Sequence, residues 1–160
     1  MAPTPSPHDP ALQLLPSPVV VVGAADGERR AGLTAAWVTR VSSAPPLLAV
    51  AVSPLRHTHG LLCDGREFTI SVLSEGQVEV ARLFGLQSGR DLDKWERTPA
   101  VLLGTGVPAL RDCAARLLCR LVGRHQAGDH ELLVGEVLDS EVVAGGPALP
   151  MRGTDYAPRG

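Results

Sequence analysis

The sequence predicts a mostly β protein, an antiparallel barrel with a few short peripheral helices. Six or seven segments have the length and the apolar or alternating pattern of strands, whereas two short segments have helical spacing. No regular alternation of strand and helix and no internal repeat is present, which argues against a doubly wound parallel sheet. The length of 160 residues fits one domain, residues 15–160, behind a flexible Pro-rich tail, residues 1–14.

The domain begins with three strand candidates. The β-branched run PVVVVGAA, residues 18–25, ends at the turn signal DGERRAG, and GLTAAW, residues 32–37, follows. This pair predicts an antiparallel hairpin. The apolar run PLLAVAVS, residues 46–53, lies between prolines and predicts a strand that is buried on both faces.

A helix, a strand and a second helix follow. RHTHGLLCDG, residues 56–65, predicts a short helix that ends at Gly65. EFTISVL, residues 67–73, alternates and predicts a strand with one buried face; its inward side chains are Phe68, Ile70 and Val72, opposite Thr69 and Ser71. Residues 77–87 have helical spacing, with inward side chains at Val80, Leu83, Phe84 and Gln87 and outward ones at Glu79 and Arg82.

Two long strands complete the predicted barrel. A polar loop, residues 88–100, precedes them, and QAGD joins residues 113–125 to residues 130–143. Alternation assigns the side chains of the first long strand to two faces, Leu117, Cys119 and Leu121 on one and Arg116, Arg120 and Arg124 on the other.

Composition excludes several classes of function. A formal net charge of −2 and an aromatic content of 3% argue against nucleic-acid binding. The longest apolar runs are too short to cross a bilayer, and the opening residues lack the pattern of a signal peptide. Three cysteines without a CxxC pair indicate a reducing compartment. We therefore expect a cytoplasmic protein without a membrane or nucleic-acid partner.

The common catalytic motifs are absent from the sequence. No GxxxxGK[ST] loop, no GxGxxG after a strand, no HExxH and no GxSxG occurs. His57 and His59 would share one face of a strand, but they diverge at the start of a helix, and no metal site is predicted there.

Residues 32–62 concentrate hydrogen-bonding groups beside strand-like sequence. Arg56 and Thr58 stand where a loop enters the helix predicted over residues 56–65, and Ser42 and Ser43 stand beside a predicted turn. Such hydroxyls and cations bind a phosphate at a helix N-terminus. Thr58 would equally serve as the cap of a helix, and Ser42 and Ser43 as caps of a turn, worth about 1 kcal/mol each. The residues alone leave both interpretations open.

The order of the motifs resembles the flavin reductase-like family, which includes flavoredoxins. The resemblance rests on SPVVVVGAADGERRAGLTAAWVTRVSSAPPLLAVAVSPLRHTHGLL, EFTISVLSEGQVEVARLFG, SGRDLDKW and AGDHELLVGEVL, in that order. It covers residues 17–156, nearly the whole chain. The resemblance implies an FMN-binding split β-barrel with a few short peripheral helices.

The resemblance also implies site residues. Those lining the flavin ring would be Thr34, Ala35, Ala36, Trp37 and a turn at Val41, Ser42 and Ser43. Those binding the phosphate would be Ser53, Arg56, His57 and Thr58. Lys94 of the DK pair would close the cofactor site, and His130 would be catalytic on the nicotinamide side of the ring.

The implied activity is hydride transfer from NADH or NADPH to FMN, with delivery of electrons to an acceptor such as a monooxygenase partner. The flavin carries this chemistry, so no sharp catalytic constellation is needed. The family also implies a homodimer. Two alternatives stay open, a non-catalytic FMN-binding electron carrier and a haem-binding split barrel with histidine ligands.

Overall fold

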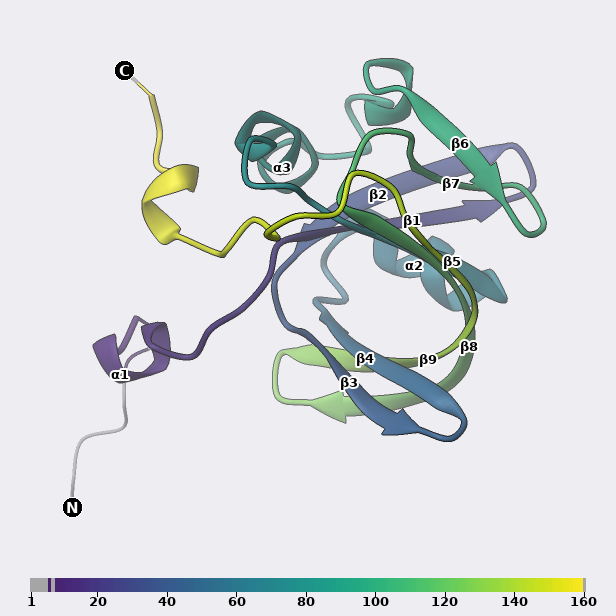
Figure 1. Cartoon of the computed structure of the whole chain (residues 1–160), viewed down its shortest axis with the longest axis horizontal. Helices are drawn as coiled ribbons and strands as arrows, with labels where there is room; N and C mark the ends of the chain where they lie inside the picture. The colour runs from purple at the N-terminus through teal and green to yellow at the C-terminus, as the bar shows by residue number, and fades with distance from the viewer. Residues whose placement is uncertain (1–5, 7, 160) are drawn as a thin grey trace.

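A computed structural model describes residue 6 and residues 8–159 of the chain (Figure 1). The predicted tail, residues 1–14, lies partly outside this range, at residues 1–5 and 7. Its described part includes the short helix α1, Pro10–Gln13, where the Asp9 side chain accepts a hydrogen bond from the Ala11 N–H. Within the described residues, no helix is both long enough and apolar enough to span a membrane.

Seven strands of the described chain form one antiparallel sheet, in the order β2-β1-β5-β8-β9-β4-β3. Their bounds are β1 Val20–Asp26, β2 Arg29–Ala35, β3 Val38–Ser43, β4 Pro46–Val52, β5 Glu67–Val72, β8 Ala115–Ala127 and β9 His130–Val142. Strands β2 and β3 form opposite edges, yet only Ala36 and Trp37 separate them in sequence. The sheet must therefore curl until its edges approach each other, as Figure 1 shows. The predicted barrel-like antiparallel fold is confirmed.

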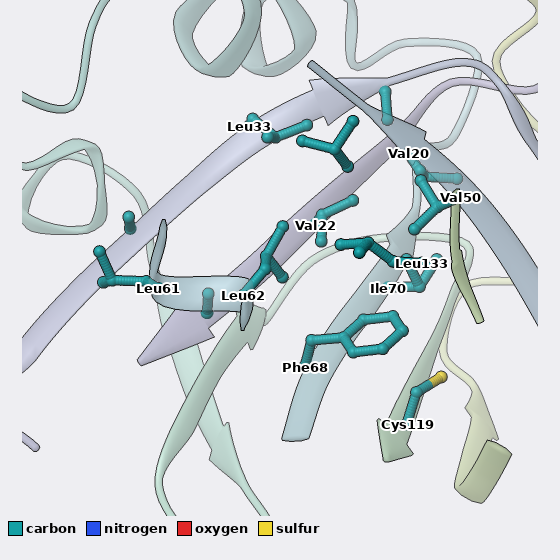
Figure 2. Packing of buried hydrophobic residues seen from close by; sticks show 14 of the residues in the cluster. Val20, Val22, Leu33, Val50, Leu61, Leu62, Phe68, Ile70, Cys119 and Leu133 are labelled. Carbon is teal, nitrogen blue, oxygen red and sulfur yellow. The ribbon is translucent and has the colours of Figure 1, made fainter. Parts of the chain in front are cut away.

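Both faces of the curled sheet are covered where β1 crosses it. Val20 and Val22 belong to the cluster inside the curl, whereas Val19 and Val21 belong to a second cluster on its outer face. This explains the continuous run of valines in place of an alternating pattern. Figure 2 shows the inner cluster, in which Phe68 and Ile70 of β5 point toward side chains from neighbouring strands and from α2, His57–Asp64.

A hairpin covers the outer face of β5 and corrects one prediction. Thr69 and Ser71 were expected on an exposed face, but both are fully buried. Strand β7, Val107–Leu110, packs against β5 and pairs with β6, Ala100–Leu103, in a hairpin outside the curled sheet (Figure 1). The Thr69 hydroxyl donates to the Pro108 carbonyl at 2.6 Å, and the Leu110 N–H donates to Ser71 Oγ at 3.0 Å. Polar side chains are tolerated here because each has a hydrogen-bond partner.

Strand β3 is a second correction. The sequence places Val41, Ser42 and Ser43 in a turn, but they lie on an edge strand that pairs with β4. The register shifts between Arg40 and Ser42, and this irregularity removes the alternation by which a strand is recognised.

Two predicted helices are confirmed within a residue or two of their expected ends. Helix α2 is followed by Gly65 and contributes Leu61 and Leu62 to the inner cluster. Helix α3, Val78–Leu86, packs Ala81 and Phe84 into the outer cluster. Gln87 was expected to face inward but is exposed, because the helix has ended before it.

The long hairpin of β8 and β9 has the two faces that the sequence predicts. Leu117, Cys119 and Leu121 pack against the inner cluster. The arginines of the other face each pair with a glutamate of β9, in the pairs Arg116–Glu141, Arg120–Glu136 and Arg124–Glu131. These pairs cross between neighbouring strands and help to fix the register of the hairpin.

Candidate functional site

A pocket of about 220 Å³ opens where the start of α2 faces the segment that follows α3. Four residues predicted for the cofactor site line it, namely Arg56, His57, Thr58 and Lys94. The remaining lining residues are Leu55, Gly85, Leu86, Gln87, Ser88, Gly89 and Arg90. Residues from two distant parts of the sequence thus form one site.

Lys94 is a buried cation of this pocket. Its side chain is 3% exposed, and its Nζ donates to the carbonyls of Phe84 at 2.8 Å and Gly32 at 3.1 Å. An ammonium has three N–H donors, so one remains for a ligand. Burial, together with the charge of Arg56, lowers the pKa of Lys94 from 10.5 to about 8.

The DKW block holds Lys94 in place. Lys94 begins a short 3-10 helix, Lys94–Glu96, where the Asp93 carboxylate accepts from the Trp95 N–H at 2.9 Å. Asp93 also accepts from Arg30 of β2 at 3.0 Å, and Trp95 Nε1 donates to the Ala31 carbonyl at 2.9 Å. The block is thereby tied to β2, and the lysine points at the end of α3.

Arg56 adds a second cation beside the first. Its Nη2 donates to the Phe84 carbonyl at 3.3 Å, so Arg56 and Lys94 share one acceptor. Burial lowers the pKa of Arg56. Among the described residues, neither cation forms an ion pair with a carboxylate. Two partly desolvated cations without a counter-charge make this pocket a candidate anion site.

The first turn of α2 presents N–H groups at the same place. Arg56 is the N-cap residue, and its side chain does not cap the helix. Thr58 lies inside the helix, is 3% exposed and lines the pocket, so the interpretation of Thr58 as a helix cap is wrong. Free N–H groups at a helix start favour an anion. Ser53 accepts from the Leu55 N–H at 3.3 Å and shapes the preceding turn.

Glycine is required where the loop after α3 approaches α2. A Cβ built on Gly89 would lie 2.8 Å from Cδ2 of His57, closer than side chains tolerate. The sequence marked residues 88–100 as a polar loop and did not assign Gln87, Ser88 or Arg90 to the site. The signal for Arg90 was a cation within a Gly- and Ser-containing loop, which by itself does not specify a ligand.

The end of β2 and its connection to β3 lead from the edge of this pocket to an aromatic pair. Thr34 donates to the Ala81 carbonyl at 2.7 Å and lies against Gly85 of the pocket. Three residues later, Trp37 is 62% exposed, and its ring centroid lies 4.7 Å from that of His130. The structure therefore brings Trp37 and His130 together, as a shared site requires.

The other predicted ring residues differ in what they can offer. The Ala35 side chain is buried in the inner cluster, so its backbone alone is available to a ligand. Ala36 is half-buried between the two strands. Val41 and Ser43 are exposed on the edge strand β3, and Ser42 is partly exposed.

Comparison with known proteins identifies the family. The family model for the flavin reductase like domain matches residues 12–157. The chain belongs to the flavin reductase-like family. The resemblance that the sequence motifs predicted is confirmed over nearly the same residues.

Members of the family with curated names include close relatives of this chain. It is 36% identical over 146 residues to "NADH:riboflavin 5'-phosphate oxidoreductase" of Streptomyces pristinaespiralis, covering 88% of this chain and 78% of that protein. It is 35% identical over 127 residues to "FMN reductase (NADH) RutF" of Methylorubrum extorquens strain DM4. That alignment covers 77% of this chain and 60% of the relative, so this chain spans well under two thirds of that protein.

Solved structures of the family share the fold. An FMN-binding protein from Thermus thermophilus, solved with 1-cyclohex-2-enone, superposes with a TM-score of 0.86 at 34% identity. The alignment covers 97% of this chain and 91% of that protein. The curled sheet and its peripheral helices are thus shared with that FMN-binding protein.

Proposed function

We propose that this protein is an NAD(P)H-dependent flavin oxidoreductase that binds FMN and passes hydride-derived electrons to an acceptor. The observation that carries the proposal is the pocket in which Arg56 and Lys94 share the Phe84 carbonyl and have no counter-charge among the described residues. A phosphate supplies that charge. The names of the relatives support the same activity.

The residues fit FMN because residues 34–37 run from Thr34, which lies against Gly85 of the pocket, to Trp37 of the aromatic pair. Arg56, Thr58 and Lys94 would hold the phosphate, assisted by His57 and the turn at Ser53. The ring would lie along residues 34–37, bounded by the edge strand at Val41, Ser42 and Ser43. When bound, the flavin supplies the capacity to accept a hydride and release electrons.

His130 has a positioning role in this proposal. Its Nδ1 lies 2.7 Å from the Asp129 carboxylate, and its ring packs against Trp37. The hydrogen bond to His130 lowers the pKa of Asp129, and the ionised carboxylate helps to orient the imidazole. An imidazole fixed beside the ring site would orient the nicotinamide of NADH or NADPH.

We also propose that the protein works as a cytoplasmic homodimer. Trp37 and Val41 are large apolar side chains exposed on and beside the edge strand β3. Exposed apolar groups next to an unpaired strand edge are typical of an interface between copies. The described cysteines Cys63, Cys113 and Cys119 are free thiols, which suits a reducing compartment. Analytical ultracentrifugation of the Val41→Asp variant tests the dimer, which this charge should dissociate.

The phosphate assignment is tested by comparing FMN with riboflavin, which lacks the phosphate. The double variant Arg56→Ala/Thr58→Ala should bind FMN at least about 10-fold more weakly, since hydrogen bonds to charged groups contribute about 1.5–3 kcal/mol each. Its affinity for riboflavin should be unchanged. Arg66→Ala, which removes an exposed arginine outside the pocket, is the matched control. Equal FMN affinity in the double variant and the control would contradict the assignment.

The activity is tested on the FMN-loaded protein by adding NADH, then NADPH, without oxygen. Loss of the oxidised flavin absorption on adding either nucleotide supports a reductase. A flavin spectrum that persists with both nucleotides would instead identify an electron carrier that another protein reduces.

A further inference from the structure

Three side chains of types that bind metal ions form a cluster outside the pocket. His59 and Cys63 are four residues apart on α2, so they lie on one face of that helix, and Glu131 reaches them from β9. None of the three lines the pocket. The side chains of His59 and Glu131 are 12% and 14% exposed. The cluster is therefore partly shielded but still reachable from solvent.

The distances between the ligand atoms match those of a tetrahedral zinc site. His59 Nε2 lies 3.3 Å from Glu131 Oε1, and Cys63 Sγ lies 3.6 Å from that nitrogen and 3.7 Å from that oxygen. Tetrahedral zinc bonds of about 2.0–2.3 Å place nitrogen and oxygen about 3.3–3.5 Å apart, and sulfur about 3.5–3.7 Å from either. All three observed distances fall at or within these ranges.

We propose that His59, Cys63 and Glu131 form a binding site for Zn²⁺ or a similar divalent transition metal, with water as the fourth ligand. An imidazole nitrogen, a thiolate and a carboxylate form a ligand set that zinc accepts. One thiolate and one carboxylate balance the two positive charges of the ion. Three protein ligands with a fourth solvent position resemble the open zinc sites of proteins more than the closed, four-ligand structural sites.

Arg124 orients the carboxylate of this site. Its Nε donates to Glu131 Oε1 at 2.8 Å, and its Nη2 donates to Oε2 at 3.2 Å. Metal binding through Oε1 leaves the contact with Oε2 in place, so Arg124 becomes an outer-shell partner of the ligand. The metal would join α2 to β9, elements that are far apart in sequence.

The test is a metal titration of the untagged, full-length protein with a competing zinc chelator. One equivalent of Zn²⁺ should bind, and each of His59→Ala, Cys63→Ser and Glu131→Gln should weaken the affinity by more than about 100-fold. Outer-shell partners alone account for about 10- to 100-fold, so a lost ligand should exceed that range. The matched controls Cys113→Ala and His8→Ala remove a thiol and an imidazole elsewhere and should leave the affinity unchanged.

Cobalt substitution identifies the ligands directly. Co²⁺ should produce ligand-field bands at longer wavelengths than flavin absorption, together with a thiolate charge-transfer band that disappears in Cys63→Ser. Thermal unfolding with and without Zn²⁺ separates ligand loss from misfolding, since a folded variant keeps its transition but loses the zinc-dependent rise in Tm. No bound zinc in the wild-type protein, or equal affinity in the ligand variants and the controls, would overturn the proposal.

Discussion

The buried ammonium of Lys94 offers a direct physical test of the pocket. Lys94 is the only lysine in the sequence, so protein labelled with carbon-13 at the lysine Cε yields one such side-chain signal. Titration of its chemical shift should give a midpoint at about pH 8 in place of 10.5. A midpoint near the ordinary value would refute the argument that Lys94 is a desolvated cation held ready for an anion.

The lowered pKa also has a consequence for stability with a defined sign. Between about pH 8 and pH 10.5 the unfolded chain keeps a proton that the folded chain has lost, so the folded state becomes more stable as pH rises through this window. One pKa unit corresponds to about 1.4 kcal/mol, so the fall from 10.5 to about 8 sets an upper limit of about 3.5 kcal/mol for the rise. Below pH 8 both states hold the proton, and the penalty for burying the charge is constant.

Denaturant unfolding of wild type and Lys94→Met across this window isolates the effect. The thiols of Cys63, Cys113 and Cys119 have pKa values raised by burial, so they lower stability as pH rises. Both proteins share that contribution, and the difference between them reports Lys94. Wild type should gain up to about 3.5 kcal/mol relative to Lys94→Met. Parallel pH profiles for the two proteins would show that the folded state does not penalise this charge.

Three further substitutions test the fold and the proposed ring site. Thr69→Val should destabilise the protein by about 1–3 kcal/mol, measured by denaturant unfolding, because the buried Pro108 carbonyl loses its donor; a neutral result would mean that water replaces the hydroxyl. Gly23→Ala should destabilise it by about 3 kcal/mol or more, since the added Cβ would lie 2.0 Å from the Pro108 oxygen. Unaltered stability would show that the β6–β7 hairpin can shift without penalty. His130→Ala should slow flavin reduction by NADH in stopped-flow measurements while FMN affinity stays the same, and an equal loss of FMN affinity would place His130 at the flavin instead of the nicotinamide.

The sequence predicted those parts of the fold whose own residues form a recognisable apolar or alternating pattern. The valines of β1 and the apolar run of β4 are strands because both of their faces are buried. The β6–β7 hairpin was missed because its role is tertiary. It covers Thr69 and Ser71, whose polarity in an alternating strand indicates solvent unless the covering segment is known.

In the candidate site, too, the residues with a local sequence signal were predicted from that signal, and those that depend on tertiary contacts were not. Arg56 and Thr58 precede and enter a helix, so local chemistry alone allowed either an anion site or a cap there. Lys94 was assigned only through the family resemblance. The pattern of a polar loop does not show that the Lys94 ammonium contacts the end of α3, which lies at least eight residues before Lys94 in the sequence. Arg90 was not assigned at all, since its place in the pocket depends on Gly89 packing against His57.

The choice of lysine at position 94 follows from the geometry of its partners. The other fourteen basic side chains of Lys and Arg type are arginines. The planar guanidinium of arginine can bind both oxygens of one carboxylate, as that of Arg124 does with Glu131. At position 94 the acceptors are two backbone carbonyls from different elements, Phe84 and Gly32, and a compact ammonium can meet both while a third N–H stays free. In the proposed function the phosphate of the ligand balances this pair of cations, so removing the lysine should stabilise the flavin-free protein and weaken its hold on the phosphate.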